Sequence, residues 1–203
     1  MLVVPYLVAA LVGYLLGGIP TGIVIARARG VDLTQVGSKK TGATNALRAL
    51  GPAAGAAVFL GDFLKAVVAV ALVSWLFNDP WASAIAGIAA VIGHGFSPYI
   101  KFQGGRGVTP GLGGLIVISP WIFLVALGTG VLIIIATRFV SLGSMLGTIV
   151  GASVLVFMVA VYGWSIAYVP FALVVAVFIL ISHHDNIGRL LKGSERKIGS
   201  SAR

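Results

Sequence analysis

Six long apolar stretches dominate the sequence, and they constrain the fold more than any other feature. They cover residues 2–26, 52–77, 81–100, 107–137, 141–162 and 165–182. About 20 residues of helix cross the hydrocarbon core of a bilayer, and five of the stretches are close to that length. Only 9% of the residues are charged, against roughly 25% in a soluble domain. The sequence therefore predicts an all-α integral membrane protein with one polytopic domain over residues 1–203.

The fourth stretch, residues 107–137, is too long for one upright helix, and Ser119-Pro120 marks a break within it. Splitting it there gives a short segment, 107–118, and a full span, 120–137. The short segment rises only about 18 Å as a helix, so it cannot cross a bilayer core of about 30 Å alone. Such a segment needs protein or a water-filled cavity around it. We therefore expect seven transmembrane helices, one of them short, with a pocket beside the short one.

The distribution of basic residues supports seven segments over six. With seven, thirteen of the fourteen Lys and Arg residues lie on one face, which the positive-inside rule makes cytoplasmic. The exception is Lys65, which lies close to Asp62 in the second stretch, and we interpret the two as a mutually neutralised pair. The first stretch lacks a basic leader and is read as a retained span. The expected topology has the amino terminus outside, the carboxyl terminus in the cytoplasm, and cytoplasmic segments at 27–51, 101–107, 138–141 and 183–203.

Two polar stretches on the cytoplasmic face carry groups that suit an anion. In "GSKKTGATNALRALG", residues 37–51, Ser38, Asn45 and Arg48 supply hydroxyl, amide and guanidinium donors; the alternative is an ordinary polar loop. In "FQGGRGVTPG", residues 102–111, Arg106 is flanked by glycines whose amides can form an anion-binding nest at a helix start. The alternative there is a glycine-rich re-entrant turn. These nest glycines are Gly104, Gly105 and Gly107. His94 is expected to pack beneath this loop.

Two further stretches follow later apolar runs. In "SHHDNIGRLLKGSERK", residues 182–197, His183, Asn186 and Arg189 recur at helical intervals and can share a face. The alternative is an amphipathic tail that binds anionic lipid. In "RFVSLGSM", residues 138–145, Ser141 and Ser144 can cap a helix or contact an anion, and capping is the favoured role.

Together the motifs resemble those of the bacterial acyl-phosphate:glycerol-3-phosphate acyltransferases, the PlsY type. The matching residues are Gly37-Ser38, Gly42-Ala43-Thr44-Asn45 and Arg48; Gly93-His94, Phe96 and Gly104-Gly105-Arg106-Gly107-Val108; and His183, Asn186-Ile187, Arg189-Leu190, Gly193 and Glu195. Their order and spacing match over residues 37 to 195. The chain departs from the family pattern at Lys39-Lys40, at Ser97, at Arg106 where lysine is usual, and at Thr109-Pro110.

The resemblance implies transfer of a fatty acyl group from acyl phosphate to the sn-1 hydroxyl of glycerol 3-phosphate, giving lysophosphatidic acid and phosphate in phospholipid biosynthesis. It implies a multi-pass protein of the bacterial plasma (inner) membrane with a cytoplasmic active site. Its substrates and membrane lipid are the expected partners, and no nucleic acid, cofactor or metal is expected. A monomer is the working expectation for the oligomeric state.

Residue roles follow the same resemblance. Ser38, His183 and Asn186 are the predicted catalytic residues, which orient the glycerol hydroxyl and the carbonyl. The predicted substrate-binding residues are Arg48, Asn45, Gly104, Gly105, Arg106, Gly107, Ser141 and Ser144. Two groups compete to accept the hydroxyl proton, namely His183, with an ordinary pKa near 6.5, and a phosphate oxygen of the substrate, with a second pKa around 6 to 7. The second is favoured, because no acid is clearly placed to orient His183.

Two other functions are compatible with parts of the sequence. The first is a transporter of an anionic, phosphorylated metabolite, but such sites usually lie near the bilayer midplane within inverted repeats. Here the polar groups concentrate at one face and no repeat is evident. The second is a lipid-binding scaffold that uses only the basic tail, which would leave the first two motifs without a role.

Overall fold

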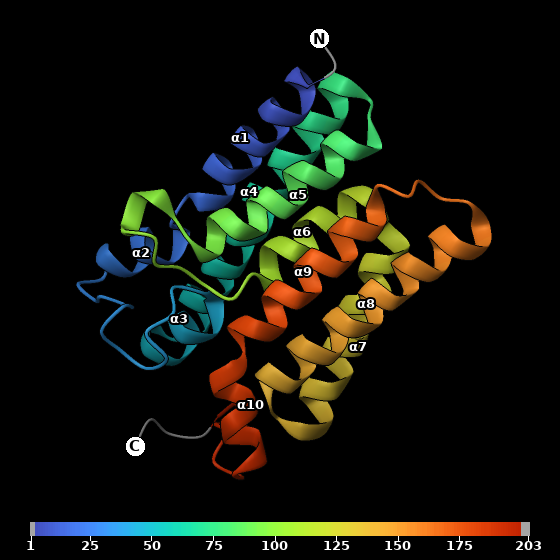
Figure 1. The fold of residues 1–203 in the computed structure, drawn as a ribbon. Coiled ribbons are helices and arrows are strands. Elements are labelled where there is room, and N and C mark those ends of the chain that lie inside the picture. Colours follow the sequence, from blue (N-terminus) through green and yellow to red (C-terminus); the bar gives the residue numbers. More distant parts are fainter. Residues whose placement is uncertain (1–2, 200–203) are drawn as a thin grey trace.

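The computed structural model describes residues 3–199, and every regular element in that range is a helix (Figure 1). In chain order the helices are α1 (Val4–Gly18), α2 (Thr21–Arg27), α3 (Ala43–Leu50), α4 (Pro52–Phe77), α5 (Pro80–Gly95), the 3-10 turn η1 (Pro98–Ile100), α6 (Val108–Ile118), α7 (Pro120–Thr137), α8 (Val140–Tyr162), α9 (Tyr168–Ser182) and α10 (His184–Leu191). The prediction of an all-α fold is confirmed for these residues.

Five helical segments of the described chain are long and apolar enough to cross a membrane. They are Val4–Arg27, Pro52–Phe77, Pro80–Ile100, Pro120–Thr137 and Val140–Tyr162. A sixth candidate is α9 together with α10, whose axes meet at 57°. The helix α6 has only 11 residues and is the short apolar segment that the sequence predicts. Its end is also as predicted, because α7 starts at Pro120 and the Ser119 hydroxyl caps it by accepting from the Ile122 amide at 3.3 Å.

The first apolar stretch forms one candidate span, as predicted, but its helix is interrupted between α1 and α2. Pro20 lacks an amide hydrogen, so it cannot continue the hydrogen-bond ladder of α1. Two carbonyl groups at the break receive side-chain donors instead: the Ser97 hydroxyl donates to the oxygen of Gly18 at 2.6 Å, and the Lys65 ammonium donates to that of Ile19 at 2.7 Å. Residues 27–51, expected as a loop, likewise contain a helix, α3.

Helices α1 and α5 pack closely because small residues line their contact. A Cβ atom at Gly17 would collide with the backbone of Ala90, and one at Gly13 would collide with that of Ala86. In a bilayer such close packing replaces the hydrophobic effect as the force between helices. Gly17 is therefore required at this crossing.

Replacing Gly17 with valine is expected to prevent normal assembly, since backbone at the contact cannot move aside as a flexible side chain could. The expected result is loss of the monodisperse peak in detergent chromatography together with loss of activity. Gly128→Ala is the matched control, because nothing lies within 4 Å of a Cβ there. A Gly17→Val protein with normal chromatography and thermal stability would contradict this packing.

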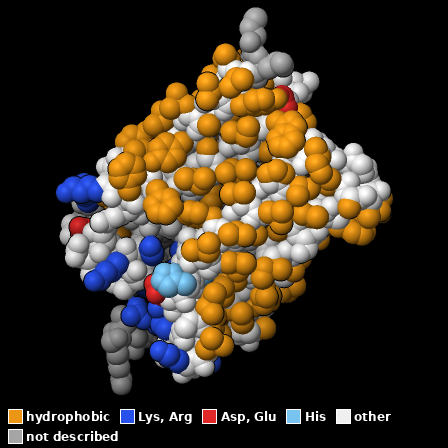
Figure 2. Space-filling view, viewed as in Figure 1, with side chains coloured by type: hydrophobic (Ala, Val, Ile, Leu, Met, Phe, Trp, Pro, Cys, Tyr) orange, Lys and Arg blue, Asp and Glu red, His pale blue; other side chains and the backbone are white. Residues whose placement is uncertain are grey.

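The surface divides into a broad apolar band and one basic end. Figure 2 shows hydrophobic side chains over most of the visible face, with Lys and Arg gathered where α2, α3 and α10 lie in Figure 1. Near the opposite end of the bundle Trp75 and Trp121 are each 79% exposed. Aromatic rings of this kind are enriched where a membrane meets water. The exposed basic side chains of residues 3–199 thus gather at one end of the bundle.

Candidate functional site

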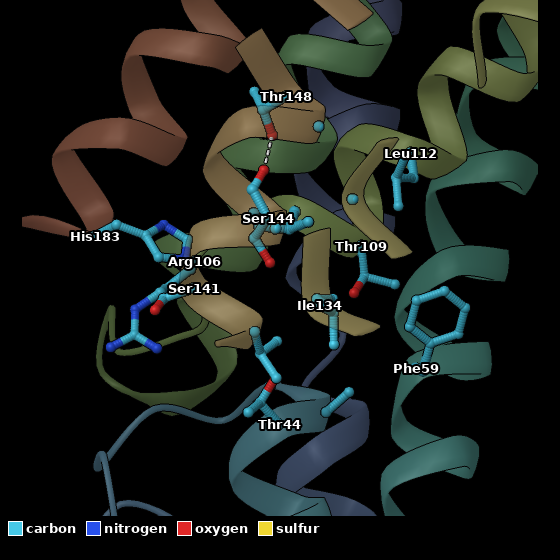
Figure 3. A pocket seen from close by; sticks show the side chains of 18 of the residues that line it. Thr44, Phe59, Arg106, Thr109, Leu112, Ile134, Ser141, Ser144, Thr148 and His183 are labelled. Carbon is cyan, nitrogen blue, oxygen red and sulfur yellow. Dashed lines mark hydrogen bonds between the residues drawn. The ribbon is translucent and has the colours of Figure 1, made fainter. Parts of the chain in front are cut away.

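A cavity of about 370 Å³ lies at the basic end of the bundle. Most of the predicted site residues line it, and they come from four separate parts of the chain: Ser38, Asn45, Arg48, Arg106, Gly107, Ser141, Ser144, His183 and Asn186. Its other wall is apolar and includes Phe59, Leu112, Leu127, Val131 and Ile134. Figure 3 shows Arg106, Ser141 and His183 on one side of this space, and Phe59 and Leu112 across from them. The cavity therefore joins a hydrogen-bonding, cationic end to an apolar arm.

A second cavity of about 160 Å³ adjoins the cationic end. It shares five residues with the first: Ser38, Arg48, Arg106, Asn186 and Glu195. Its remaining walls include Lys39, Arg189 and Arg196. The shared residues thus lie between an apolar compartment and a small, strongly basic one.

Asn45 shapes the loop in front of α3. Its Nδ2 lies 2.9–3.1 Å from the carbonyl oxygens of Leu33, Val36 and Lys40, and its Oδ1 accepts from the Ser38 amide at 3.1 Å. These contacts occupy the side-chain amide, so its structural effect is to hold the loop and the position of Ser38.

The glycine loop between η1 and α6 is only partly the anion nest that the sequence suggested. The amide of Gly105 donates to the carbonyl oxygen of His94 at 3.1 Å, so it is not available to a ligand. Gly104 and Gly105 pack against His94 and, within residues 3–199, are not part of the cavity lining, whereas Arg106 and Gly107 are. Gly107 has a φ of 85°, which favours glycine, and it is the N-cap residue of α6. The two earlier glycines thus allow close packing, and Arg106 projects from the loop.

The two cavity arginines are each anchored by one backbone contact. Arg106 donates from Nε to the Ser182 carbonyl at 3.1 Å, and Arg48 donates from a terminal nitrogen to the Arg196 carbonyl at 3.2 Å. Burial is the main cause that lowers the pKa of both below that of a free guanidinium. Arginine nevertheless stays charged in proteins, so both side chains present cationic donors to the cavity.

Glu195 is the site residue whose role the sequence did not reveal. Its Oε1 accepts from Ser141 at 2.9 Å and from Asn186 at 2.7 Å, and its Oε2 accepts from Arg189 at 2.7 Å. Burial alone would raise the pKa of Glu195, but the hydrogen bonds of these three side chains lower it below its ordinary value. The carboxylate therefore connects α8, α10 and the tail. This link has no local signal in the sequence, because Ser141 lies 54 residues from Glu195.

The predicted capping role of Ser141 is wrong. The N-cap position of α8 is Phe139, and no side chain caps that helix end. Ser141 donates to Glu195 instead, and Ser144 lines the cavity. The side chains of Ser141 and Ser144 thus face the tail and the cavity.

Replacing Glu195 with glutamine is expected to lower the thermal midpoint of the purified protein at pH 7, because three donors lose a charged acceptor. The native pKa is lowered, so this stabilisation is present above the unfolded-state pKa of about 4.5 and is lost as the pH falls through the native value. The wild-type midpoint should therefore fall more steeply than that of the variant as the pH is lowered below about 4.5. Unfolding scans from pH 3 to pH 7 measure this. Parallel curves for the two proteins would contradict the role of Glu195.

His183 and Asn186 each offer a hydrogen-bond acceptor. The His183 Nδ1 lies 2.8 Å from the carbonyl oxygen of Ile179, which can only accept, so Nδ1 carries the proton and Nε2 has a free lone pair. Burial lowers the pKa of His183 to about 4, which keeps the ring neutral at pH 7. The Asn186 Oδ1 is buried and has no partner among residues 3–199. An unpaired buried acceptor is costly, so a ligand that brings hydroxyl donors would stabilise this corner.

The predicted neutral pair in α4 is confirmed. The Lys65 ammonium lies 2.7 Å from the Asp62 carboxylate, and both side chains are buried. His94 lies beside them, as well as beneath the glycine loop. Asp62 and His94 also belong to the wall of the larger cavity.

Comparisons with known proteins give one consistent assignment. The model of the family described as Glycerol-3-phosphate acyltransferase matches residues 7–193. The glycerol-3-phosphate acyltransferase of Geobacter sulfurreducens is 41% identical over 192 residues, covering 94% of this chain and 96% of that protein. Glycerol-3-phosphate acyltransferase 1 of Deinococcus radiodurans is 41% identical over 194 residues, covering 95% and 96%.

Two solved structures share the fold over almost the whole chain. They are crystal structures of PlsY (YgiH), an integral membrane glycerol 3-phosphate acyltransferase, in its glycerol 3-phosphate form and its lysophosphatidic acid form. Their TM-scores are 0.89 and 0.86 and their identities are 37% and 36%; both alignments cover 96% of this chain, and they cover 96% and 95% of the respective solved chains. With these matches, and with the three motifs converging on one cavity, the chain belongs to the glycerol-3-phosphate acyltransferase family.

Proposed function

We propose that this protein transfers a fatty acyl group from acyl phosphate to the sn-1 hydroxyl of glycerol 3-phosphate, releasing lysophosphatidic acid and phosphate. The observation that carries the proposal is the two-part cavity, whose cationic end suits phosphate groups and whose apolar arm suits an acyl chain. The glycerol 3-phosphate and lysophosphatidic acid forms of PlsY support the same acceptor and product.

Arg48 and Arg106 hold the two phosphate groups in this scheme. Both side chains line the two adjoining cavities. One pair of arginines therefore binds the phosphate of acyl phosphate on the apolar side and the phosphate of glycerol 3-phosphate on the basic side. Guanidinium groups bind phosphate through paired, charge-assisted hydrogen bonds. The apolar arm beside Phe59 and Ile134 takes the first part of the acyl chain.

Side-chain acceptors orient glycerol, and Ser38 orients the acyl group. Asn186 Oδ1 and His183 Nε2 accept from the glycerol hydroxyls, and each lies in a side chain fixed by a second hydrogen bond. Ser38, whose amide is held by Asn45, orients the carbonyl of the acyl group. Holding both substrates in attack geometry supplies much of the rate enhancement in reactions of this kind.

The chemical step needs no covalent enzyme intermediate. The glycerol oxygen attacks the acyl carbonyl carbon, a new C–O ester bond forms, and the bond from that carbon to the phosphate oxygen breaks. A phosphate oxygen of the acyl phosphate takes the hydroxyl proton, since the second pKa of a phosphate group, around 6 to 7, lies above that of His183, and the phosphate departs with that proton. His183 orients the hydroxyl and does not remove its proton.

The topology we propose has seven transmembrane helices, α6 being the short one, with the amino terminus outside and the carboxyl terminus and active site in the cytoplasm of a bacterial inner membrane. The clustering of basic residues at one end supports it. Because the chain has no cysteine, single cysteines can report it. In intact cells, Asn78→Cys should react with an impermeant maleimide and Lys101→Cys should not. The reverse pattern would contradict the orientation.

An assay in lipid vesicles distinguishes acyl transfer from transport of a phosphorylated metabolite. We expect the protein, as a monomer in lipid vesicles with acyl phosphate, to convert radiolabelled glycerol 3-phosphate into a chloroform-soluble product. Without acyl phosphate the label should stay outside the vesicles and water-soluble. Label that accumulates unchanged inside the vesicles, with no lipid product, would instead favour the transporter.

A further inference from the structure

A buried cluster of charged and polar side chains lies under the glycine loop, and the proposed mechanism does not use it. Asp62 and Lys65 come from α4, His94 from α5 and Thr21 from α2. Their exposed fractions are 2% for Asp62, 8% for Lys65 and 6% for His94. Thr21 donates its hydroxyl to the same Asp62 oxygen that receives Lys65. The cluster therefore ties three helices together within the apolar bundle.

The stability of the bundle does not explain the presence of this cluster. A buried ion pair contributes little net stability, because desolvation of both charges offsets their attraction, and apolar side chains of similar size often replace such a pair without loss. Ionisable residues within transmembrane segments usually serve function. Asp62 and Lys65 lie in the middle third of a 26-residue helix whose one other polar residue is Ser74.

The ammonium group of Lys65 fixes the orientation of the His94 ring. Lysine has three N–H donors and no acceptor, and three acceptors surround it: Asp62 Oδ1 at 2.7 Å, the Ile19 carbonyl at 2.7 Å and His94 Nδ1 at 3.1 Å. Nδ1 therefore accepts a hydrogen bond, which places the ring proton on Nε2. Asp62, in turn, holds the ammonium group in place.

His94 in turn fixes the glycine loop. Its carbonyl oxygen receives the Gly105 amide at 3.1 Å, and its ring occupies the space where a Cβ of Gly105 would lie. Arg106 follows directly in the chain, and Gly107, with its φ of 85°, turns the backbone into α6. The position of the His94 ring therefore sets the path of the backbone that carries Arg106.

We propose that Asp62 and Lys65 are positioning residues for phosphate binding, which fix His94 and through it the loop that presents Arg106 to the substrate. The inference rests on the proposed role of Arg106 in the acyl transfer. Displacement of a binding group by about 1 Å can cost about 100-fold in rate, so a small shift of this loop has a measurable effect. A purely structural cluster would change stability and leave the kinetic constants of the folded enzyme unchanged.

The first test removes the ion pair without leaving a lone buried charge. Asp62→Asn combined with Lys65→Met keeps the side-chain sizes but takes away the ammonium group that holds His94. We expect a folded protein in which KM for glycerol 3-phosphate rises about tenfold or more. Ser83→Ala is the matched control, because Ser83 is a buried polar residue of the same helix as His94 and its hydroxyl donates to the Asp79 carbonyl. A folded double variant with KM within twofold of wild type would overturn the proposal.

The second test is a double-mutant cycle between Gly105 and His94. Gly105→Ala should raise KM because its Cβ collides with the ring. Adding His94→Ala makes room for that Cβ, so the double variant should have a lower KM than Gly105→Ala alone. Effects that simply multiply would contradict contact-mediated positioning. If the Asp62–Lys65 double variant does not fold, effects that multiply in this cycle would still overturn the proposal, because the ion pair acts on the loop through His94.

The activity of the wild-type protein distinguishes a failure of this inference from a failure of the proposed function. If the wild-type protein forms no lysophosphatidic acid from the two substrates, the function itself fails. If wild type is active and both sets of variants keep the wild-type KM, the function stands and only the positioning role is refuted.

Discussion

Replacing Arg106 with alanine is expected to lower kcat/KM for glycerol 3-phosphate by about 10²–10³-fold, equivalent to about 3–4 kcal/mol. Arg106 lines both cavities, and its side chain is partly buried. Its loss leaves a substrate phosphate without a charge-assisted partner in a site of low dielectric constant, and it also leaves the Ser182 carbonyl without its donor. Steady-state kinetics with acyl phosphate held at saturation measures the effect.

Two further variants separate charge from geometry at this position. Arg106→Lys keeps the charge but loses the planar pair of donors, and we expect an intermediate loss of about tenfold. Lys101→Ala removes a basic residue from the same loop region that is exposed and outside both cavities, and it should leave kcat/KM unchanged. Equal losses for Lys101→Ala and Arg106→Ala would mean that the general positive potential matters and not a specific contact.

Replacing His183 with alanine is expected to lower kcat by about 10²-fold, because the glycerol hydroxyl loses an orienting acceptor. Glutamine can place an amide oxygen near the position of Nε2, so His183→Gln should keep activity within about tenfold of wild type. This difference follows from a neutral ring whose Nδ1 is bound to Ile179 and whose Nε2 only accepts. Equal inactivation of both variants would restore His183 as the general base.

The pH dependence of kcat/KM tests independently whether His183 or the substrate phosphate accepts the proton. If the substrate phosphate accepts the proton, log(kcat/KM) should fall as the pH is lowered through about 6, where the dianion becomes protonated. If His183 were the base, its pKa of about 4 would keep the profile flat down to about pH 5. We expect the limb near pH 6, unchanged in His183→Gln. A flat profile from pH 5 to pH 8 would contradict the substrate-assisted step.

Features with a local or periodic signal were predicted well from the sequence. Ser119-Pro120 breaks the fourth apolar stretch because a proline and a capping serine are both local determinants of a helix start. The Asp62–Lys65 pair is three residues apart on one helix, so its contact also followed from the sequence. Most of the motif residues converge on one cavity because the spans that carry them begin or end at the same face.

Features that depend on tertiary packing were not predictable in this way. Pro20 interrupts the first span without a change in hydropathy, and the side chains that compensate for the break come from Lys65 and Ser97. The link between Ser141 and Glu195 joins distant segments, and a local capping preference wrongly explained Ser141. The glycines before Arg106 suggested open amides, but both pack against His94, and the Gly105 amide donates to its carbonyl oxygen.

The central claim, acyl transfer from acyl phosphate to glycerol 3-phosphate, is tested most directly by product stoichiometry. Purified protein would be incubated with acyl phosphate and radiolabelled glycerol 3-phosphate, and both lysophosphatidic acid and inorganic phosphate would be quantified over time. We expect the two products to appear in a one-to-one ratio. When glycerol 3-phosphate is omitted, we expect no lysophosphatidic acid and no more phosphate than in a reaction without enzyme. Absence of labelled lysophosphatidic acid, in a preparation where a PlsY relative assayed in parallel is active, would contradict this account.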